Sequence, residues 1–185
     1  KKDLLRRDFT INTLCINREG IIEDKLKIME DLDNHIIKTV GNPRYRIKED
    51  SLRILRAIRF STILDFNIEK KTKYYLEKYG YLLKNLSYQR KKEELNKIFS
   101  SNNKEKGRQL LLELKLEKYL NIEKLKDIVL CDDILGIWAQ LEVDDIYPFN
   151  KLEHNQMKDI RKLLKENLYN PYILYKYDLY LTTVA

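Results

Sequence analysis

The stretch EDSLRILRAIRF, residues 49–60, decides how this chain folds. Within it, Asp50 is followed at steps of three by Arg53, Arg56 and Arg59. Residues three apart are neighbours on the surface of an α-helix, so the acid and the three guanidinium groups form one polar ridge. The apolar residues between them lie on the other side of the axis, where they can face a core. The stretch therefore predicts a half-buried helix that presents a fixed polar array.

A second interpretation of this ridge requires no function. The helix dipole favours acids near the start of a helix and bases further along. Asp50 and Arg53 would then form a simple surface ion pair, worth about 0.2–0.5 kcal/mol. The rest of the chain has to decide between the two interpretations.

The composition is that of a folded, basic protein. Of the 185 residues, 43% are hydrophobic and 35% are charged, which is enough for one large domain or two small ones. Lys and Arg number 36 against 29 acids, and this net charge of +7 suits a polyanionic partner such as nucleic acid. No stretch approaches the roughly 18 apolar residues of a membrane span, and no signal-peptide pattern is present. We expect a cytoplasmic protein that does not enter membranes.

Neither the cysteines nor the histidines predict a site. Cys15 and Cys131 lie far apart, and neither has a second Cys or a His at metal-ligand spacing. His35 and His154 are isolated as well, and a lone His is more often a satisfied polar residue than a ligand. We predict no disulfide and no metal ligand in this chain.

The first part of the chain predicts strands. Residues 8–17 alternate in part between apolar and polar residues, and the turn at 18–20 precedes Ile21-Ile22, so we predict a β-hairpin. A further strand is predicted at 36–40, closed by the turn signal Gly41-Asn42-Pro43. Such short strands do not make a self-sufficient sheet. We therefore expect a fragment whose upstream sheet is missing, and whose C-terminal end is cut as well.

The remaining chain predicts helices, which makes the fold class mainly α. Ser87 is a natural N-cap for one helix, and Asn102 or Asn103 for the next. Apolar residues at spacings of three and four predict helices over 49–64, 68–84, 88–100, 104–116, 121–140 and 151–168.

Four segments occur in a fixed order: RRDFTIN at 6–12, IIKTVGNPRYR at 36–46, EDSLRILRAIRF at 49–60 and LSYQRKKEEL at 86–95. Together they closely resemble the class II tRNA nucleotidyltransferases, which are the CCA-adding enzymes, and the bacterial poly(A) polymerases of the same family. The resemblance is strong over about residues 3–100 and general over the later helices. It implies three parts: the end of a polymerase β-like nucleotidyltransferase head (1–46), a helical neck with the nucleotide-reading helix (47–100) and a helical body (101–185).

The resemblance also implies an activity for the full protein. This activity is template-independent addition of C and A nucleotides to the 3′ end of tRNA, from CTP and ATP with Mg²⁺. Poly(A) synthesis, and addition of CC alone or A alone, are alternatives within the family. A non-catalytic helical RNA-binding module is the alternative from another class. The fragment would supply nucleotide selection and would be inactive by itself.

By this resemblance, Asp50 and Arg53 form the pair that reads the base of the incoming nucleotide. The chemistry supports this role, because cytosine and adenine both carry an exocyclic amino group that a carboxylate can accept from, whereas uracil has a carbonyl there. Arg53 can donate to ring acceptors of either base. Arg56 and Arg59 are implied to hold the nucleotide too, unless one of them forms only a structural salt bridge.

RRDFTIN is implied to contact the triphosphate. Arg7 is the best candidate, because an Arg at the lip of a strand supplies charge where the leaving pyrophosphate develops it. Arg6 lies beside it, and Asp8 is a ribose or network partner. Thr10 and Asn12 alternate with apolar residues, so they share one face of the predicted strand, which either supports the site or is simply solvated.

Two further groups are weighed against plain structural roles. Arg90 and Glu94 are spaced i, i+4, and we predict that they form a structural pair that braces their helix. Five C-terminal tyrosines either stack on RNA bases or pack into the core; they are Tyr169, Tyr172, Tyr175, Tyr177 and Tyr180.

Nucleotidyl transfer needs metal-bound carboxylates. In this family they come from a DxD pair on a strand that follows a Gly-Ser loop, and that combination is absent from these residues. Asp31 and Asp33 have DxD spacing, but they match an ordinary segment before IIKTVG, so we assign no metal to them. Asp132-Asp133 and Asp144-Asp145 are predicted to face solvent. Ile28 stands where relatives usually have glycine, which predicts a different path for its loop.

Overall fold

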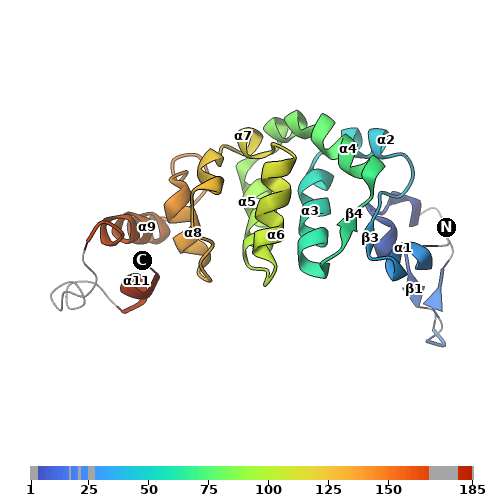
Figure 1. Cartoon of the computed structure of the whole chain (residues 1–185), viewed down its shortest axis with the longest axis horizontal. Coiled ribbons are helices and arrows are strands. Elements are labelled where there is room, and N and C mark those ends of the chain that lie inside the picture. The colour runs from blue at the N-terminus through green and yellow to red at the C-terminus, as the bar shows by residue number, and fades with distance from the viewer. Residues whose placement is uncertain (1–3, 17, 21, 25–27, 167–178, 185) are drawn as a thin grey trace.

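The computed structural model describes residues 4–16, 18–20, 22–24, 28–166 and 179–184. A small β-containing segment leads into a row of helices that together form an elongated arch (Figure 1). The N-terminal segment lies at one end of the arch and the last helices lie at the other. The predicted, mainly helical fold class is confirmed. Among the described residues no helix is long and apolar enough to cross a membrane.

Short 3₁₀ helices join the α-helices. The α-helices are α1 (Met29–Asp33), α2 (Pro43–Glu49), α3 (Leu52–Leu64), α4 (Lys70–Lys78), α5 (Tyr88–Phe99), α6 (Lys104–Glu113), α7 (Glu117–Leu120), α8 (Ile134–Leu141), α9 (Lys151–Leu163) and α11 (Leu179–Val184). The 3₁₀ helices are η1 (Leu4–Arg6), η2 (Thr10–Asn12), η3 (Gly80–Asn85) and η4 (Glu123–Lys126).

The predicted β-hairpin is present but shorter than expected. Strand β1 (Cys15–Ile16) pairs antiparallel with β2 (Ile22–Glu23). The preceding residues are not a strand, because the backbone N–H and the hydroxyl of Thr13 both donate to the Thr10 carbonyl and close the turn η2. The prediction that Thr10 and Asn12 share a strand face is therefore wrong.

The second predicted strand is also short. Strand β3 (Ile36–Ile37) pairs in parallel with β4 (Asn67–Ile68), which follows α3. Beyond β3, Thr39 forms one isolated antiparallel bridge with Phe9. This bridge fixes the N-terminal segment against the start of the helical part.

The helix predicted over 49–64 is α3, which begins at Leu52, and a separate helix that was not predicted, α2, ends at Glu49 just before it. Asn42 caps α2, since its side chain accepts from the N–H of Arg44 at 3.0 Å, and Pro43 occupies the first turn. Asp50 lies between the two helices in an extended conformation, φ −145° and ψ 105°. Its Oδ1 accepts from the N–H of Leu52 at 3.1 Å and so caps the start of α3. Asp50 is therefore not part of a continuous helical ridge.

Two other predicted helices end early. The helix predicted over 68–84 is α4, which gives way to the 3₁₀ helix η3, and the helix predicted over 104–116 is α6, which ends at Glu113. Asn103 is the N-cap residue of α6, without a side-chain cap bond. The N-cap of α5 is as predicted, because the Ser87 hydroxyl accepts from the N–H of Arg90.

The helix predicted over 121–140 is wrong. Asn121 adopts a left-handed conformation, φ 58°, and ends α7. After η4, a separate helix α8 starts where Asp133 Oδ1 accepts from the N–H of Gly136 at 2.9 Å. The last long helix, α9, opens with a capping box between Asn150 and Glu153. It ends at residue 163, and the predicted end at 168 lies outside the described residues.

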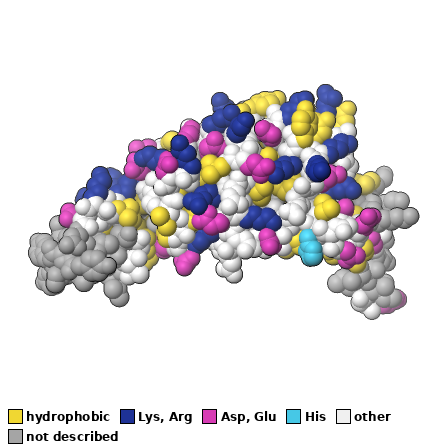
Figure 2. Space-filling view, in the orientation of Figure 1, with side chains coloured by type: hydrophobic (Ala, Val, Ile, Leu, Met, Phe, Trp, Pro, Cys, Tyr) yellow, Lys and Arg dark blue, Asp and Glu magenta, His cyan; other side chains and the backbone are white. Residues whose placement is uncertain are grey.

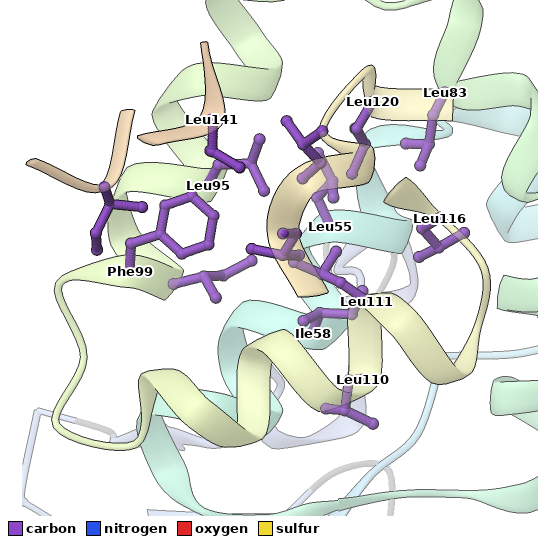
Figure 3. Packing of buried hydrophobic residues seen from close by; sticks show 14 of the residues in the cluster. Leu55, Ile58, Leu83, Leu95, Phe99, Leu110, Leu111, Leu116, Leu120 and Leu141 are labelled. Atoms are coloured by element: carbon purple, nitrogen blue, oxygen red, sulfur yellow. The ribbon is translucent and has the colours of Figure 1, made fainter. Parts of the chain in front are cut away.

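The apolar side of α3 faces the core, as the sequence predicts. Leu55 and Ile58 are fully buried among side chains of α5 and α6 (Figure 3). Burial of each such side chain stabilises the fold by about 1.5–3 kcal/mol. The helices approach closely at Gly107, where an added Cβ would lie 2.4 Å from Ile98 Cγ2. The other side of α3 is left to carry its arginines.

Candidate functional site

Asp8 joins two of the arginines of α3. Its Oδ1 lies 2.9 Å from Nε of Arg53, and its Oδ2 lies 2.8 Å from Nη2 of Arg56. The backbone holds Asp8 in place. Its carbonyl accepts a hydrogen bond from the N–H of Val40, and the following residue, Phe9, forms the β-bridge with Thr39. The Asp8 side chain is only 11% exposed, whereas that of Arg56 is 34% exposed. Of the two alternatives for Asp8, the network contact is the one present.

Arg53 is the most enclosed arginine of the cluster. Besides Asp8, its Nη1 donates to Glu49 Oε2 at 2.8 Å and to the Arg46 carbonyl. Burial lowers the pKa of Arg53, but the hydrogen bonds to Asp8 and Glu49 outweigh it, so that the pKa is raised overall. The hydrogen bond from Arg53 in turn lowers the pKa of Glu49. Within the described residues Nη2 of Arg53 makes no hydrogen bond, so one end of the fork remains available.

Asp50, three residues before Arg53, has one carboxylate oxygen that accepts no hydrogen bond from the described residues. Its Oδ1 accepts from Leu52 and lies 3.6 Å from Nη2 of Arg90, while no described residue donates to Oδ2. The side chain is 34% exposed. The surface ion pair considered between Asp50 and Arg53 is not formed, because Arg53 pairs with Asp8 and Glu49.

Arg59 lies in a different environment. Its Nη1 is 2.9 Å from Glu94 Oε2 on α5, and both side chains are largely buried. Burial lowers the pKa of Arg59, against the opposing effect of Glu94. The prediction that Arg90 pairs with Glu94 is wrong, because Arg90 contacts Asp50 and Glu94 contacts Arg59. Each residue of the predicted pair thus contacts a residue outside α5 instead.

Arg46 was missed by the sequence reasoning. Its Nη2 donates to the carbonyls of Arg6 and Arg7, each at 2.7 Å, and its Nη1 pairs with Glu49. The side chains of Arg6 and Arg7 are exposed, and Asn12 is half-buried in η2. The only sequence signal for Arg46 is its place at the end of IIKTVGNPRYR.

The described residues do not fit a Mg²⁺ site. Nowhere among them do three His, Cys, Asp or Glu side chains gather as metal ligands would. Asp31 pairs with Lys38 at 3.5 Å. Asp144 does not face solvent freely as predicted, because Arg161 binds both of its oxygens, at 3.0 and 2.9 Å.

Two remaining predictions concern a loop and the tyrosines. Ile28 adopts an ordinary φ of −105°, and its N–H donates to Asp24 Oδ1. The backbone conformation at this position therefore does not require glycine. Of the C-terminal tyrosines, only Tyr180 is described, and its hydroxyl donates to Asp133. The other four lie outside the described residues.

Two family models match this chain. Residues 1–38 match "Poly A polymerase head domain" and residues 65–125 match "Probable RNA and SrmB- binding site of polymerase A". The CCA-adding enzyme of Lactobacillus helveticus (strain DPC 4571) is 39% identical over 141 residues, which cover 76% of this chain and 34% of that relative. The chain belongs to the family of CCA-adding enzymes and poly(A) polymerases. The curated relatives from Streptococcus thermophilus (strain CNRZ 1066) and Bacillus cereus (strain G9842) are CCA-adding enzymes as well.

Solved structures of CCA-adding enzymes share the fold. The Bacillus stearothermophilus CCA-adding enzyme in complex with CTP matches with a TM-score of 0.87 and 25% identity, over 99% of this chain and 52% of that one. The Thermotoga maritima CCA-adding enzyme complexed with tRNA matches with a TM-score of 0.70 and 26% identity, over 89% of this chain and 50% of that one. This chain, a member of the nucleotidyltransferase family, spans only part of the length of its curated relatives. It covers 34% of the Lactobacillus helveticus enzyme, 30% of the Streptococcus thermophilus enzyme and 52% of the Bacillus cereus enzyme.

Proposed function

We propose that the complete protein adds C and A nucleotides to the 3′ end of tRNA without a nucleic-acid template, and that this chain selects the nucleotide. The observation that carries the proposal is an acceptor and a donor, three residues apart, that the described part of the chain leaves unused: Oδ2 of Asp50 and Nη2 of Arg53. The CTP complex and the tRNA complex of the two solved relatives support the choice of substrates.

In this proposal Asp50 accepts from the exocyclic amino group of cytosine or adenine, and Arg53 donates to a ring acceptor. Asp8 and Glu49 hold Arg53 in advance, which lowers the entropy lost when a nucleotide binds. A uracil would place a carbonyl against the Asp50 carboxylate. The unpaired groups would then cost about 1–3 kcal/mol.

The other contacts are proposals of the same kind. Arg7 contacts the triphosphate, with Arg6 and Asn12 in support, and Arg56 adds positive charge from the half-exposed edge of the cluster. Arg59 braces α3 through Glu94. We further propose that the head ends at residue 46, the neck spans 47–100 and the body spans 101–185.

Catalysis would depend on carboxylates outside the described residues. Mg²⁺ bound there would supply the positive charge that nucleotidyl transfer requires. We therefore propose that these 185 residues have no transferase activity alone. The complete protein would act in the cytoplasm, on maturing or damaged tRNA.

The base-reading role is tested with Asp50→Ala in the complete protein. We expect discrimination of CTP and ATP against UTP to fall about 5- to 160-fold, because the lost hydrogen bond is worth about 1–3 kcal/mol. The measurement is incorporation of each labelled nucleotide into tRNA. Asp132→Ala, which removes a fully exposed acid from a distant loop, is the matched control and should leave discrimination unchanged. Unchanged nucleotide choice in Asp50→Ala would contradict the assignment.

The reaction itself is tested on tRNA that ends at the nucleotide before CCA. With CTP and ATP together we expect exactly three added nucleotides, and with ATP alone almost none. Long A tails would instead favour poly(A) synthesis, the activity that the description of the head-domain model names.

A further inference from the structure

Arg46 differs from the exposed cations of this chain in where its side chain lies. Figure 2 shows Lys and Arg side chains spread over the visible face of the arch, many of them beside acids. The side chain of Arg46 is only 15% exposed, and its Nε is buried. Arg46 lies on α2, between the residues that the two family models match, so neither description assigns it a role.

The guanidinium group of Arg46 fixes the backbone of the N-terminal segment. Its Nη2 donates to the carbonyls of Arg6 and Arg7, each at 2.7 Å. Arg6 ends the short helix η1, and the last carbonyls of a helix have no partner within it, so a guanidinium group is a suitable donor to them. The next carbonyl, that of Asp8, accepts from the N–H of Val40 at 3.0 Å. Three successive carbonyls are therefore held at the point where Arg7, the proposed triphosphate contact, leaves the backbone.

The same residue reaches both members of the proposed base-reading pair. The carbonyl of Arg46 accepts from the N–H of Asp50 at 3.4 Å and from Nη1 of Arg53. Nη1 of Arg46 pairs with Oε2 of Glu49, and this oxygen also accepts from Nη1 of Arg53 at 2.8 Å. The hydrogen bond from Arg53, and then the charge of Arg46, lower the pKa of Glu49. The Glu49 carboxylate thus stays ionised between two guanidinium groups.

We infer that Arg46 is a positioning residue for nucleotide selection, which holds the triphosphate contact and the base-reading pair in one fixed geometry. This role rests on the proposed function, which places the triphosphate on Arg7 and the base on Asp50 and Arg53. Alignment of this kind matters, because a displacement of about 1 Å caused by a distant residue can cost about 10²-fold in rate. Arg46 does not bind the nucleotide itself, since its side chain is largely enclosed and both Nη atoms donate within the protein.

The contacts of Arg46 are specific to arginine. The planar guanidinium group directs Nη1 to Glu49 and Nη2 to two carbonyls at the same time. A lysine ammonium group is a single point charge, so it cannot reach both sides in a fixed orientation. Arg46→Lys therefore keeps the charge and loses the link between the two sides, whereas Arg46→Met loses both.

The first test measures base selection by the complete protein. Equilibrium binding of CTP and of UTP requires neither tRNA nor catalysis, and it is compared between the wild type and the variants. We expect the preference for CTP over UTP to fall about fivefold in Arg46→Lys and about tenfold in Arg46→Met. The matched control, Arg44→Met, removes an exposed cation of the same helix and should keep the preference. An unchanged preference in either Arg46 variant, or an equal fall in Arg44→Met, would overturn the inference.

The second test measures the triphosphate side alone. Inorganic tripolyphosphate carries phosphate charge but no base, so its Kd reports on the N-terminal segment. We expect this Kd to rise about fivefold in Arg46→Lys, although the charge is kept. Glu49→Gln breaks the path to Arg53 and leaves the Arg6 and Arg7 carbonyls held, so it should weaken the base preference without raising the Kd for tripolyphosphate. If the Kd stays constant in Arg46→Lys, or rises equally in Glu49→Gln, Arg46 does not link the two sides.

A merely structural role would give another pattern. Loss of folded protein lowers kcat equally for every nucleotide, but it changes neither a Kd nor the ratio of two affinities. In the positioning role, Arg46→Met and Glu49→Gln break the same path, so the double variant should discriminate within about twofold of Arg46→Met alone. Fully additive losses of discrimination would contradict that path.

The role of Arg46 and the proposed function can fail separately. A complete protein that prefers CTP through Arg46 but adds no nucleotide to tRNA would refute the proposed function and leave the role of Arg46 intact. A protein that adds CCA and loses discrimination in Asp50→Ala, yet keeps it in both Arg46 variants, would refute the role of Arg46 alone.

Discussion

The two ends of the arginine row on α3 differ in how many acceptors hold each guanidinium group. Arg53, at the first turn, donates to two acids and one carbonyl, and the side chain of its neighbour Arg56 is 34% exposed. Arg59, two turns later, pairs among the described residues with a single acid, Glu94, and its guanidinium lies 4.3 Å from the centroid of the Phe60 ring; the side chains of Arg59 and Glu94 are nearly enclosed. Arg53 and Arg59, which the regular spacing makes look equivalent, therefore differ in the number of acids that hold them. The end with several partners is suited to binding a ligand, while the end with one partner is suited to joining helices.

The largest effect is expected from Glu94→Ala. It would leave the enclosed charge of Arg59 without an acidic partner among the described residues, so we expect the free energy of unfolding to fall by about 3–5 kcal/mol. Urea unfolding would measure this loss. Glu94→Gln keeps an acceptor oxygen and should lose less. If Glu94→Ala lost less free energy of unfolding than Asp8→Ala, the expected order of the two ends of the arginine row would be wrong.

Asp8→Ala should have an intermediate effect on stability. Arg53 keeps Glu49 and the Arg46 carbonyl, and Arg56 can be hydrated, so we expect a loss of about 1–3 kcal/mol in urea unfolding. The same change frees Arg53 to move, so discrimination against UTP should fall as well. Glu94→Gln, at the other end of α3, is the control for discrimination and should leave it unaltered.

Lys91 sharpens the comparison, because it is a buried cation of α5 that pairs with no acid in the part of the chain that the structure describes. It is 1% exposed, and its Nζ lies 4.2 Å from the centroid of the Tyr88 ring. Burial lowers its pKa from the usual 10.5. Lys91→Met keeps the volume and removes the charge, so we expect the free energy of unfolding at neutral pH to rise by about 1 kcal/mol.

The pH dependence gives a second measurement of Lys91. Because its pKa is lower in the folded protein, the unfolded chain binds more protons between that pKa and 10.5, so stability should rise with pH over this interval. Lys91→Met should lose this part of the rise, whereas the exposed Lys71→Met should keep it. Equal pH dependence in both variants would contradict the role given to Lys91.

Much of the fold was predictable because its signals are local. The periodicity of α3, α5 and α9 and the cap at Ser87 depend on residues within one or two turns. The main errors came from two helix N-caps that the hydrophobic periodicity did not indicate. Asn42-Pro43 starts a helix where we predicted only a turn, and Asp133 starts α8 inside the predicted helix 121–140.

The candidate site was predictable in its residues but not in its contacts. The motifs single out Asp8, Asp50 and Arg53, yet spacing alone could not show that Asp8 reaches α3 from 45 positions away. The role of Arg46 depends on backbone carbonyls, which carry no residue identity. Contacts of this kind follow from the tertiary fold and leave no local pattern.

Arg46 also has a consequence for motion. One side chain holds the carbonyls of Arg6 and Arg7, and through Glu49 it shares a carboxylate with Arg53. Lifting the N-terminal segment from α2 breaks these bonds together, and it removes Asp8 from Arg53 at the same time. Detachment of the segment and loosening of Arg53 therefore form one cooperative opening unit, whose amides should exchange hydrogen at a common rate.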